Sequence, residues 1–153
     1  MTTGTATTLQ TGHIGLNVSD LDRSTHFYAM AFGFQIQDES RGEGRRYAFL
    51  GDGERPVLTL WEQGDGRFDA ARPGLHHLSF QVATLDDVRD AEARLRALGA
   101  EVRYGGIVAH GTGADSGGLF FEDPDGIRLE IYAPTGVAGA PAPVADAPTC
   151  GFF

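Results

Sequence analysis

The sequence predicts an α+β fold of two βαβββ modules in tandem, at about residues 12–66 and 74–134. The first observation is a repeat, in which HIGLNV at 13–18 shares its pattern with HLSFQV, found 64 positions later at 77–82. The second is a helical pattern of similar length after each of these runs, and the third is a set of three strand-like runs after each helix. Because the order of elements is the same in both halves, we expect similar units around a shared core.

The first module is expected to open with a strand at 13–18, where apolar residues alternate and leave His13 on the polar face. A helix is expected at about 20–32, because apolar side chains recur there at helical spacing and Gly33 suits a C-terminal cap. Three further strands are expected, at 34–38, 45–50 and 56–62.

The second module is expected to open with a strand at 77–82 that carries His77 on its polar face. A helix is expected at about 85–98, with Thr84 as its N-cap. Three strands are expected to follow, at 100–104, 118–122 and 127–132. Glu130 in the last strand is expected on the same polar side as His77, and such a face either meets water or lines a cavity.

The two ends of the chain differ in composition from the central region, residues 12–134. Residues 1–11 are rich in Thr and are expected to be flexible. Residues 135–153 form a C-terminal tail so rich in Pro, Ala and Gly that no regular element is expected there. Cys150 is the single cysteine, which excludes an intrachain disulfide, and we expect it to be a bystander in a mobile tail. The alternative is that TCGFF folds over the cleft.

The charge balance limits the classes of partner. The chain has 12 basic and 21 acidic residues and a net charge of −9, which argues against nucleic acid or an anionic membrane as partner. No apolar run approaches the length of a membrane span, and the N-terminus lacks the pattern of a signal peptide. We therefore expect a soluble, cytoplasmic protein.

Four sequence stretches, in this order, carry a family resemblance over about residues 12–134. They are HIGLNVSDLDRSTHFY, AFGF, GLHHLSFQV and FEDPDGIRLEIY. Together with the two modules, they make the chain similar to the vicinal oxygen chelate superfamily. This superfamily includes glyoxalase I, extradiol dioxygenases, fosfomycin-modifying enzymes and bleomycin-binding proteins.

The resemblance implies a metal site. Carried over residue by residue, the ligands are His13, His77 and Glu130, in a cleft formed by the two curved mixed sheets, while His76 faces away. Two imidazoles and a carboxylate suit one divalent ion with open positions for a substrate. Fe²⁺ or Mn²⁺ is favoured, and Zn²⁺ or Ni²⁺ is possible.

Other residues are candidates for contact with the substrate. In the resemblance, glyoxalase I has a second glutamate where this chain has Thr59, and Glu62 is expected on the opposite face, so glyoxalase chemistry is in doubt. Thr59 and Trp61 share a face and are candidate substrate contacts, although Trp61 also fits a buried core position. Tyr132 and His110 are candidate catalytic residues; the alternatives are a cavity-wall tyrosine and an exposed loop histidine.

The predicted function is a metal-dependent enzyme whose substrate chelates the ion through vicinal oxygens. Extradiol-type dioxygenase chemistry is the first expectation. The alternatives are a lyase, isomerase or thiol transferase on the same metal, and a metal-free antibiotic-binding resistance protein. A homodimer is expected, because each module offers sheet edges that similar proteins pair between subunits.

Overall fold

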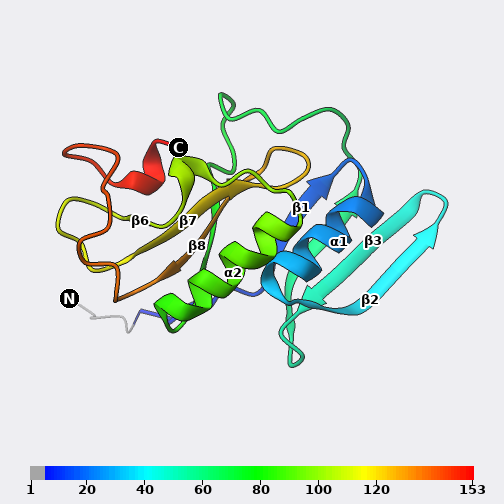
Figure 1. Cartoon of the computed structure of the whole chain (residues 1–153). Coiled ribbons are helices and arrows are strands. Elements are labelled where there is room, and N and C mark those ends of the chain that lie inside the picture. The colour runs from blue at the N-terminus through cyan, green and yellow to red at the C-terminus, as the bar shows by residue number, and fades with distance from the viewer. Residues whose placement is uncertain (1–5) are drawn as a thin grey trace, which may run out of the picture.

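The computed structural model describes residues 6–153, in which two four-stranded sheets are joined through two neighbouring helices (Figure 1). Each sheet is mixed and open, and each helix covers the apolar face of its own module, so the predicted α+β fold is confirmed. The predicted flexible segment 1–11 lies partly outside the described residues. No helix within 6–153 has the length and hydropathy needed to cross a membrane.

The first module follows its predicted order. Its elements are β1 (Ile14–Val18), α1 (Leu21–Phe32), β2 (Gln35–Gly42), β3 (Arg45–Gly51) and β4 (Pro56–Glu62). Helix α1 begins where the Asp20 side chain accepts a hydrogen bond from the Arg23 N–H, and it ends at Gly33, whose φ of 71° is in the left-handed region. The sheet has the order β1-β4-β3-β2, with β1 parallel to β4.

The second module repeats this arrangement. Its elements are β5 (Leu78–Gln81), α2 (Leu85–Ala97), β6 (Val108–Ala109), β7 (Gly117–Glu122) and β8 (Arg128–Ala133). Thr84 and Asp87 form a reciprocal capping box at the start of α2, as predicted for Thr84. The sheet order is β5-β8-β7-β6, with β5 parallel to β8.

The strand predicted at 100–104 is wrong. Val102 makes only an isolated bridge to Phe121, and the chain then forms a short 3-10 turn, Arg103–Gly105. Tyr104 has a φ of 58°, which is incompatible with a strand. The edge strand of this sheet is the two-residue β6 instead, which pairs with the beginning of β7.

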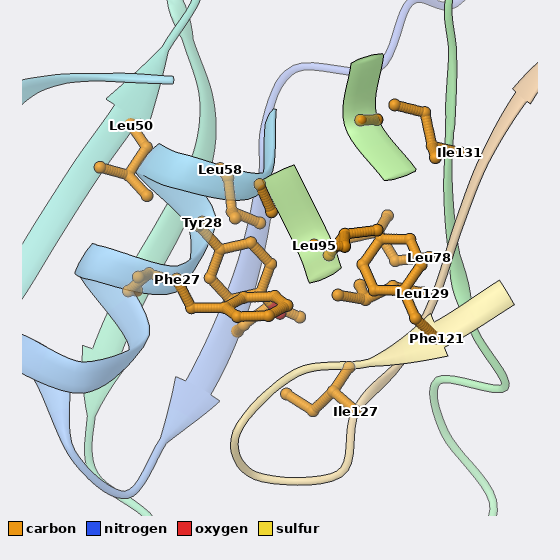
Figure 2. Packing of buried hydrophobic residues seen from close by; sticks show 14 of the residues in the cluster. Phe27, Tyr28, Leu50, Leu58, Leu78, Leu95, Phe121, Ile127, Leu129 and Ile131 are labelled. Carbon is orange, nitrogen blue, oxygen red and sulfur yellow. The ribbon is translucent and has the colours of Figure 1, made fainter. Parts of the chain in front are cut away.

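Side chains from both modules form one core (Figure 2). Phe27 and Tyr28 of α1 lie between Leu58 of the first sheet and Phe121 and Leu129 of the second. The Phe27 ring lies 6.4 Å from that of Phe121, which brings the two modules into direct contact. The halves are therefore similar in order but interdependent in packing.

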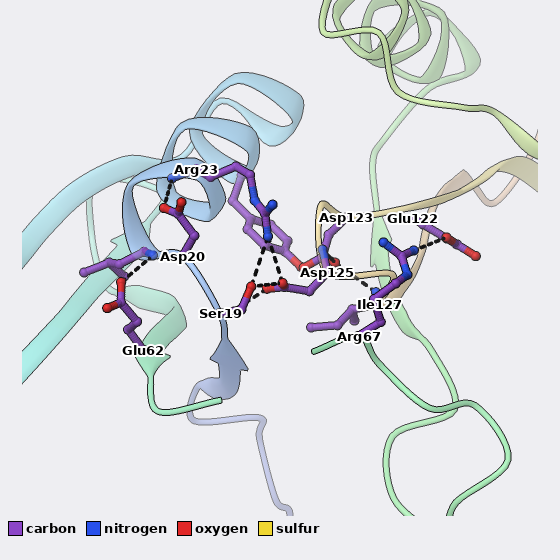
Figure 3. A network of polar contacts seen from close by, with 11 residues as sticks. Ser19, Asp20, Arg23, Glu62, Arg67, Glu122, Asp123, Asp125 and Ile127 are labelled. Atoms are coloured by element: carbon purple, nitrogen blue, oxygen red, sulfur yellow. Dashed lines mark hydrogen bonds and ion pairs between the residues drawn. The ribbon is translucent and has the colours of Figure 1, made fainter. Parts of the chain in front are cut away.

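A polar network joins the first helix to the turn before β8 (Figure 3). Arg23 pairs with Asp125 at 2.9 Å, and Ser19 also donates to that carboxylate. The buried Tyr28 hydroxyl donates to Asp123 at 2.8 Å, and Asp123 accepts the N–H of Ile127. Burial raises the pKa of Asp123, opposed by these hydrogen bonds. The network fixes the turn that leads into β8.

The C-terminal segment, residues 134–153, packs on the polar face of the second sheet. As predicted, it contains no helix or strand except a 3-10 turn, Thr149–Gly151. However, the Thr149 N–H donates to the His110 carbonyl at 2.9 Å, and the Phe153 ring lies 4.7 Å from that of Phe120. Thr149 and Phe153 are buried, so the segment is a packed part of the fold rather than a mobile tail.

Candidate metal centre

The pairing of the parallel strands defines equivalent positions in the two sheets. Gly15 pairs with Thr59 between β1 and β4, and Ser79 pairs with Glu130 between β5 and β8. Because Gly15 and Ser79 are related by the 64-residue offset of the repeat, Thr59 occupies the place in the first sheet that Glu130 has in the second. The predicted equivalence of these two positions is confirmed.

Glu130 is the centre of the candidate site. Strand β8 directs Leu129 and Ile131 into the core, and alternation therefore places Glu130 on the opposite face. Its side chain is only 3% exposed, because the C-terminal segment covers that face. One carboxylate oxygen lies 2.5 Å from His110 Nε2 and the other lies 3.5 Å from His77 Nε2.

His77 lies directly before β5 and is half-buried. Its Nε2 faces Glu130, while its Nδ1 lies 2.7 Å from Nδ1 of the exposed His76. His76 is exposed and contacts the ring nitrogen of His77 that does not face Glu130; because β5 begins only at Leu78, strict alternation does not extend to the two histidines. Burial lowers the pKa of His77, opposed by the Glu130 carboxylate, which favours the neutral imidazole that metals bind.

His110 follows β6 and bridges Glu130 to a serine that sequence reasoning missed. Its Nδ1 lies 2.9 Å from Ser116 Oγ, and its ring centre lies 4.9 Å from that of Tyr132. The short β6–β7 hairpin places Ser116 opposite, because the His110 N–H also donates to the Ser116 carbonyl. His110 is thus held against Glu130 from two sides and is not an exposed loop histidine.

Cys150 joins this site from the C-terminal segment. One ligand atom from each of His77, Glu130 and Cys150 lies within 4.8 Å of the other two. Burial and the nearby Glu130 charge raise the pKa of the thiol. TCGFF packs over the polar face that carries Glu130, and Cys150 is therefore not a bystander in a mobile tail.

His13 and Thr59 lie apart from this cluster, whereas Tyr132 lies beside it. His13 is exposed and does not belong to the group of His77, Glu130 and Cys150. Thr59 is buried beneath Trp61, whose Nε1 donates to Thr59 Oγ1 at 3.0 Å. The Tyr132 hydroxyl donates to Gln81 at 2.8 Å.

Trp61 is half-buried and belongs to an aromatic group on the polar face of the first sheet. Its ring centre lies 5.5 Å from that of Tyr47 and 5.7 Å from that of Phe49. Glu62 lies on the other face, as predicted, where it accepts the Leu21 N–H at 2.8 Å. That bond occupies Glu62 at the start of α1.

The charges around Glu130 fit a bound cation. Within residues 6–153 the carboxylate forms no ion pair with an arginine, and its two neighbours are imidazoles. A buried carboxylate without a full positive partner is destabilising. A cation between Glu130 and His77 would supply that charge, and the N, O and S donors present suit a divalent transition metal.

Known proteins match most of the chain. The family model of the Glyoxalase/Bleomycin resistance protein/Dioxygenase superfamily matches residues 10–131. Catechol-2,3-dioxygenase of Bacillus subtilis (strain 168) is 31% identical over 124 residues, which are 80% of this chain and 40% of that protein, so the chain spans less than half of that relative. A probable lactoylglutathione lyase of Synechocystis sp. is 32% identical over 130 residues, which cover 78% of this chain and 91% of that protein.

Solved structures share the fold. A glyoxylase/bleomycin resistance protein/dioxygenase domain from Frankia sp. EAN1pec superimposes with a TM-score of 0.69 at 29% identity, covering 83% of this chain and 98% of that one. The fosfomycin resistance protein FosX from Listeria monocytogenes, complexed with Mn(II) and sulfate, gives a TM-score of 0.59 at 24% identity, covering 88% and 95%. At that identity, the likeness to FosX shows the fold alone.

Proposed function

This chain belongs to the Glyoxalase/Bleomycin resistance protein/Dioxygenase superfamily, and on that premise we propose that it is a divalent-metal-dependent enzyme. Its substrate is a small molecule that chelates the ion through two neighbouring oxygens. The observation that carries the proposal is the buried Glu130, whose carboxylate faces His77 Nε2 without an arginine partner within residues 6–153. His77 and Glu130 would hold the ion. Once bound, a divalent ion would act as a Lewis acid toward the substrate oxygens.

His13 completes the proposed site from a second copy of the chain. It lies directly before β1, which is an edge strand of an open sheet, and its side chain is exposed. The corresponding residue of the second module, His77, lies directly before the edge strand β5. Pairing of two copies along these edge strands would bring His13 of one copy toward the second module of the other, which is why we retain the homodimer as a proposal.

Oxidative, extradiol-type chemistry is the proposed reaction. Thr59 is buried and hydrogen-bonded where a fourth ligand, a second carboxylate, would otherwise stand, which leaves open positions for substrate oxygens and dioxygen. The similarity to a catechol dioxygenase supports the same choice, although it covers less than half of that protein. Fe²⁺ or Mn²⁺ suits such a donor set.

The chain's own residues supply proton handling and shape. His110 holds or accepts a proton at Nε2, because that atom lies 2.5 Å from Glu130 while Ser116 orients the other ring nitrogen. The Tyr132 ring lies tilted beside that of His110 and bounds the site. The Trp61 group would present a flat apolar surface to a planar substrate once two copies pair.

A non-oxidative lyase is the second candidate. It is favoured by the similarity to a probable lactoylglutathione lyase, because the match covers 91% of the length of that relative. A metal-free drug-binding protein is disfavoured, because drug binding does not require a buried carboxylate with two imidazoles facing it. The two enzymatic candidates differ in whether dioxygen is consumed.

The test combines metal analysis with an oxygen electrode. Full-length protein purified without chelator is expected to contain about one divalent ion per chain. After loading with Fe²⁺, it is expected to consume dioxygen with a member of a catechol panel, whereas Glu130→Gln loses both metal and activity. Metal binding without oxygen uptake would move the assignment to the lyase class, and absence of metal would refute the proposed function.

A further inference from the structure

The C-terminal segment brings a third type of ligand atom to the candidate metal centre. The 3-10 turn that carries Cys150 is anchored to the second sheet by Thr149, whose hydroxyl donates to the Ala109 carbonyl at 2.7 Å. On the other side of Cys150, the Phe153 ring packs against His77 at 5.6 Å and against Phe120. Two buried anchors therefore hold the thiol over this face.

The thiol, the imidazole and the carboxylate come from three separate parts of the chain. Their ligand atoms lie within 4.8 Å of one another. Small rotations of the side chains can bring atoms at this separation to coordination distance from one ion. The Glu130 oxygen nearest His77 lies 3.5 Å from Nε2 of that histidine, beyond the usual length of a hydrogen bond, and the Glu130 side chain is 97% buried. A buried carboxylate oxygen whose nearest partner is this distant is available to coordinate a metal.

We propose that Cys150 is a ligand of the ion held by His77 and Glu130, so that the C-terminal segment closes the site as a metal-bound lid. This inference rests on the proposed metal function. When the ion binds, the S–H bond breaks, its proton passes to solvent and the sulfur donates a lone pair to the ion. The thiolate and the carboxylate then balance the charge of a divalent ion, which lowers the penalty for burying it.

A thiolate ligand changes which ions the site prefers and how it is completed. Sulfur is a softer donor than imidazole or carboxylate, so Zn²⁺ and Co²⁺ gain affinity relative to Mn²⁺. In addition, His77, Glu130 and Cys150 form a three-ligand set within one chain. Metal binding by a single copy therefore does not require His13.

Cobalt titration of the metal-free, full-length protein tests the proposal. Because Cys150 is the single cysteine, a near-ultraviolet thiolate-to-cobalt charge-transfer band must arise from it. We expect one equivalent of Co²⁺ to produce this band in the wild type and in His76→Ala. In Cys150→Ser the band is lost, and Co²⁺ affinity falls by more than the roughly 10–100-fold that loss of an outer-shell partner costs.

Thiol reactivity supplies a second readout that needs no cysteine variant. A disulfide reagent is expected to modify Cys150 of the metal-free wild type, and bound Zn²⁺ or Co²⁺ is expected to slow this reaction at least tenfold. If Co²⁺ binds stoichiometrically without the charge-transfer band, and modification is not slowed, Cys150 is not a ligand and the proposed metal function still stands. If the wild type binds no Co²⁺, both proposals fail.

Discussion

Replacing Tyr28 with phenylalanine tests whether the polar network between the modules stabilises the fold. In the wild type the Tyr28 hydroxyl is fully buried and donates to Asp123 at 2.8 Å. The variant Tyr28→Phe keeps the ring but leaves one oxygen of a buried carboxylate without a donor. An unsatisfied buried group of this kind costs about 1–3 kcal/mol. At about 2 kcal/mol, a chain of this size should lose roughly 4–8 °C in Tm.

The assay is urea unfolding followed by circular dichroism, with Tyr47→Phe as the matched control. Tyr47 makes the same type of bond, to Asp38, but the bond is 3.3 Å long and exposed. We therefore expect its loss to change the free energy of unfolding by less than about 0.5 kcal/mol. Equal effects of the two substitutions would refute the reasoning, because burial would then not determine the cost.

The pH dependence of the Tyr28→Phe effect follows from the pKa of Asp123. Burial raises this pKa and the Tyr28 hydrogen bond lowers it, so the variant should raise it further. A raised folded-state pKa favours the protonated carboxyl, and the resulting stability is lost as pH rises through that pKa. The gap between wild type and variant should thus be larger at about pH 8 than at about pH 3, below the ordinary carboxyl range. A gap that widens toward acid would contradict this assignment.

Three further predictions concern the metal ligand His77, the C-terminal Phe153 and the Glu62 carboxylate at the start of α1. His77→Ala should abolish metal binding measured by elemental analysis while His76→Ala retains most of it; equal loss would remove the distinction between the two imidazoles. Phe153→Ala should lower the free energy of unfolding by about 3 kcal/mol or less and speed modification of Cys150, because the ring is an anchor of the lid; unchanged thiol reactivity would argue against that role. The pKa of Glu62 is lowered by hydrogen bonds from the Leu21 N–H and from an arginine. The stability that this lowered pKa contributes is present above the unfolded-state pKa and is lost as pH falls through the folded-state pKa, so the destabilisation by Glu62→Gln in chemical unfolding should shrink on acidification. A pH-independent effect would show that Glu62 does not act through its charge.

Local patterns predicted most of the fold because the elements follow from local physics. Alternation in β8 was sufficient to place Glu130 opposite Leu129, and cap residues such as Thr84 marked where a helix begins. The strand predicted at 100–104 failed because Tyr104 adopts a positive φ, which no pattern of apolar residues reveals. A β-like composition does not report the backbone conformation of a single residue.

The site was only partly predictable for a different reason. Strand alternation predicted His77 and Glu130 on one polar face, and the family resemblance implied that they are metal ligands. The approach of Cys150 depends on the path of a segment without periodicity, and its neighbours in space are distant in sequence. The contact between His110 and Glu130 likewise arises from the short β6–β7 hairpin, which alternation did not predict.

The polar network between the modules also affects the order of folding. Each sheet forms from strands of its own module, whereas Ser19 and Asp125 are 106 positions apart and Tyr28 and Asp123 are 95 apart. Closing such long loops carries a larger entropic penalty than pairing neighbouring strands, and contacts of this kind slow folding. We therefore expect each module to form first and the two modules to dock last. Until they dock, the apolar side chains of their shared core remain open to solvent, and the chain is then most prone to aggregation.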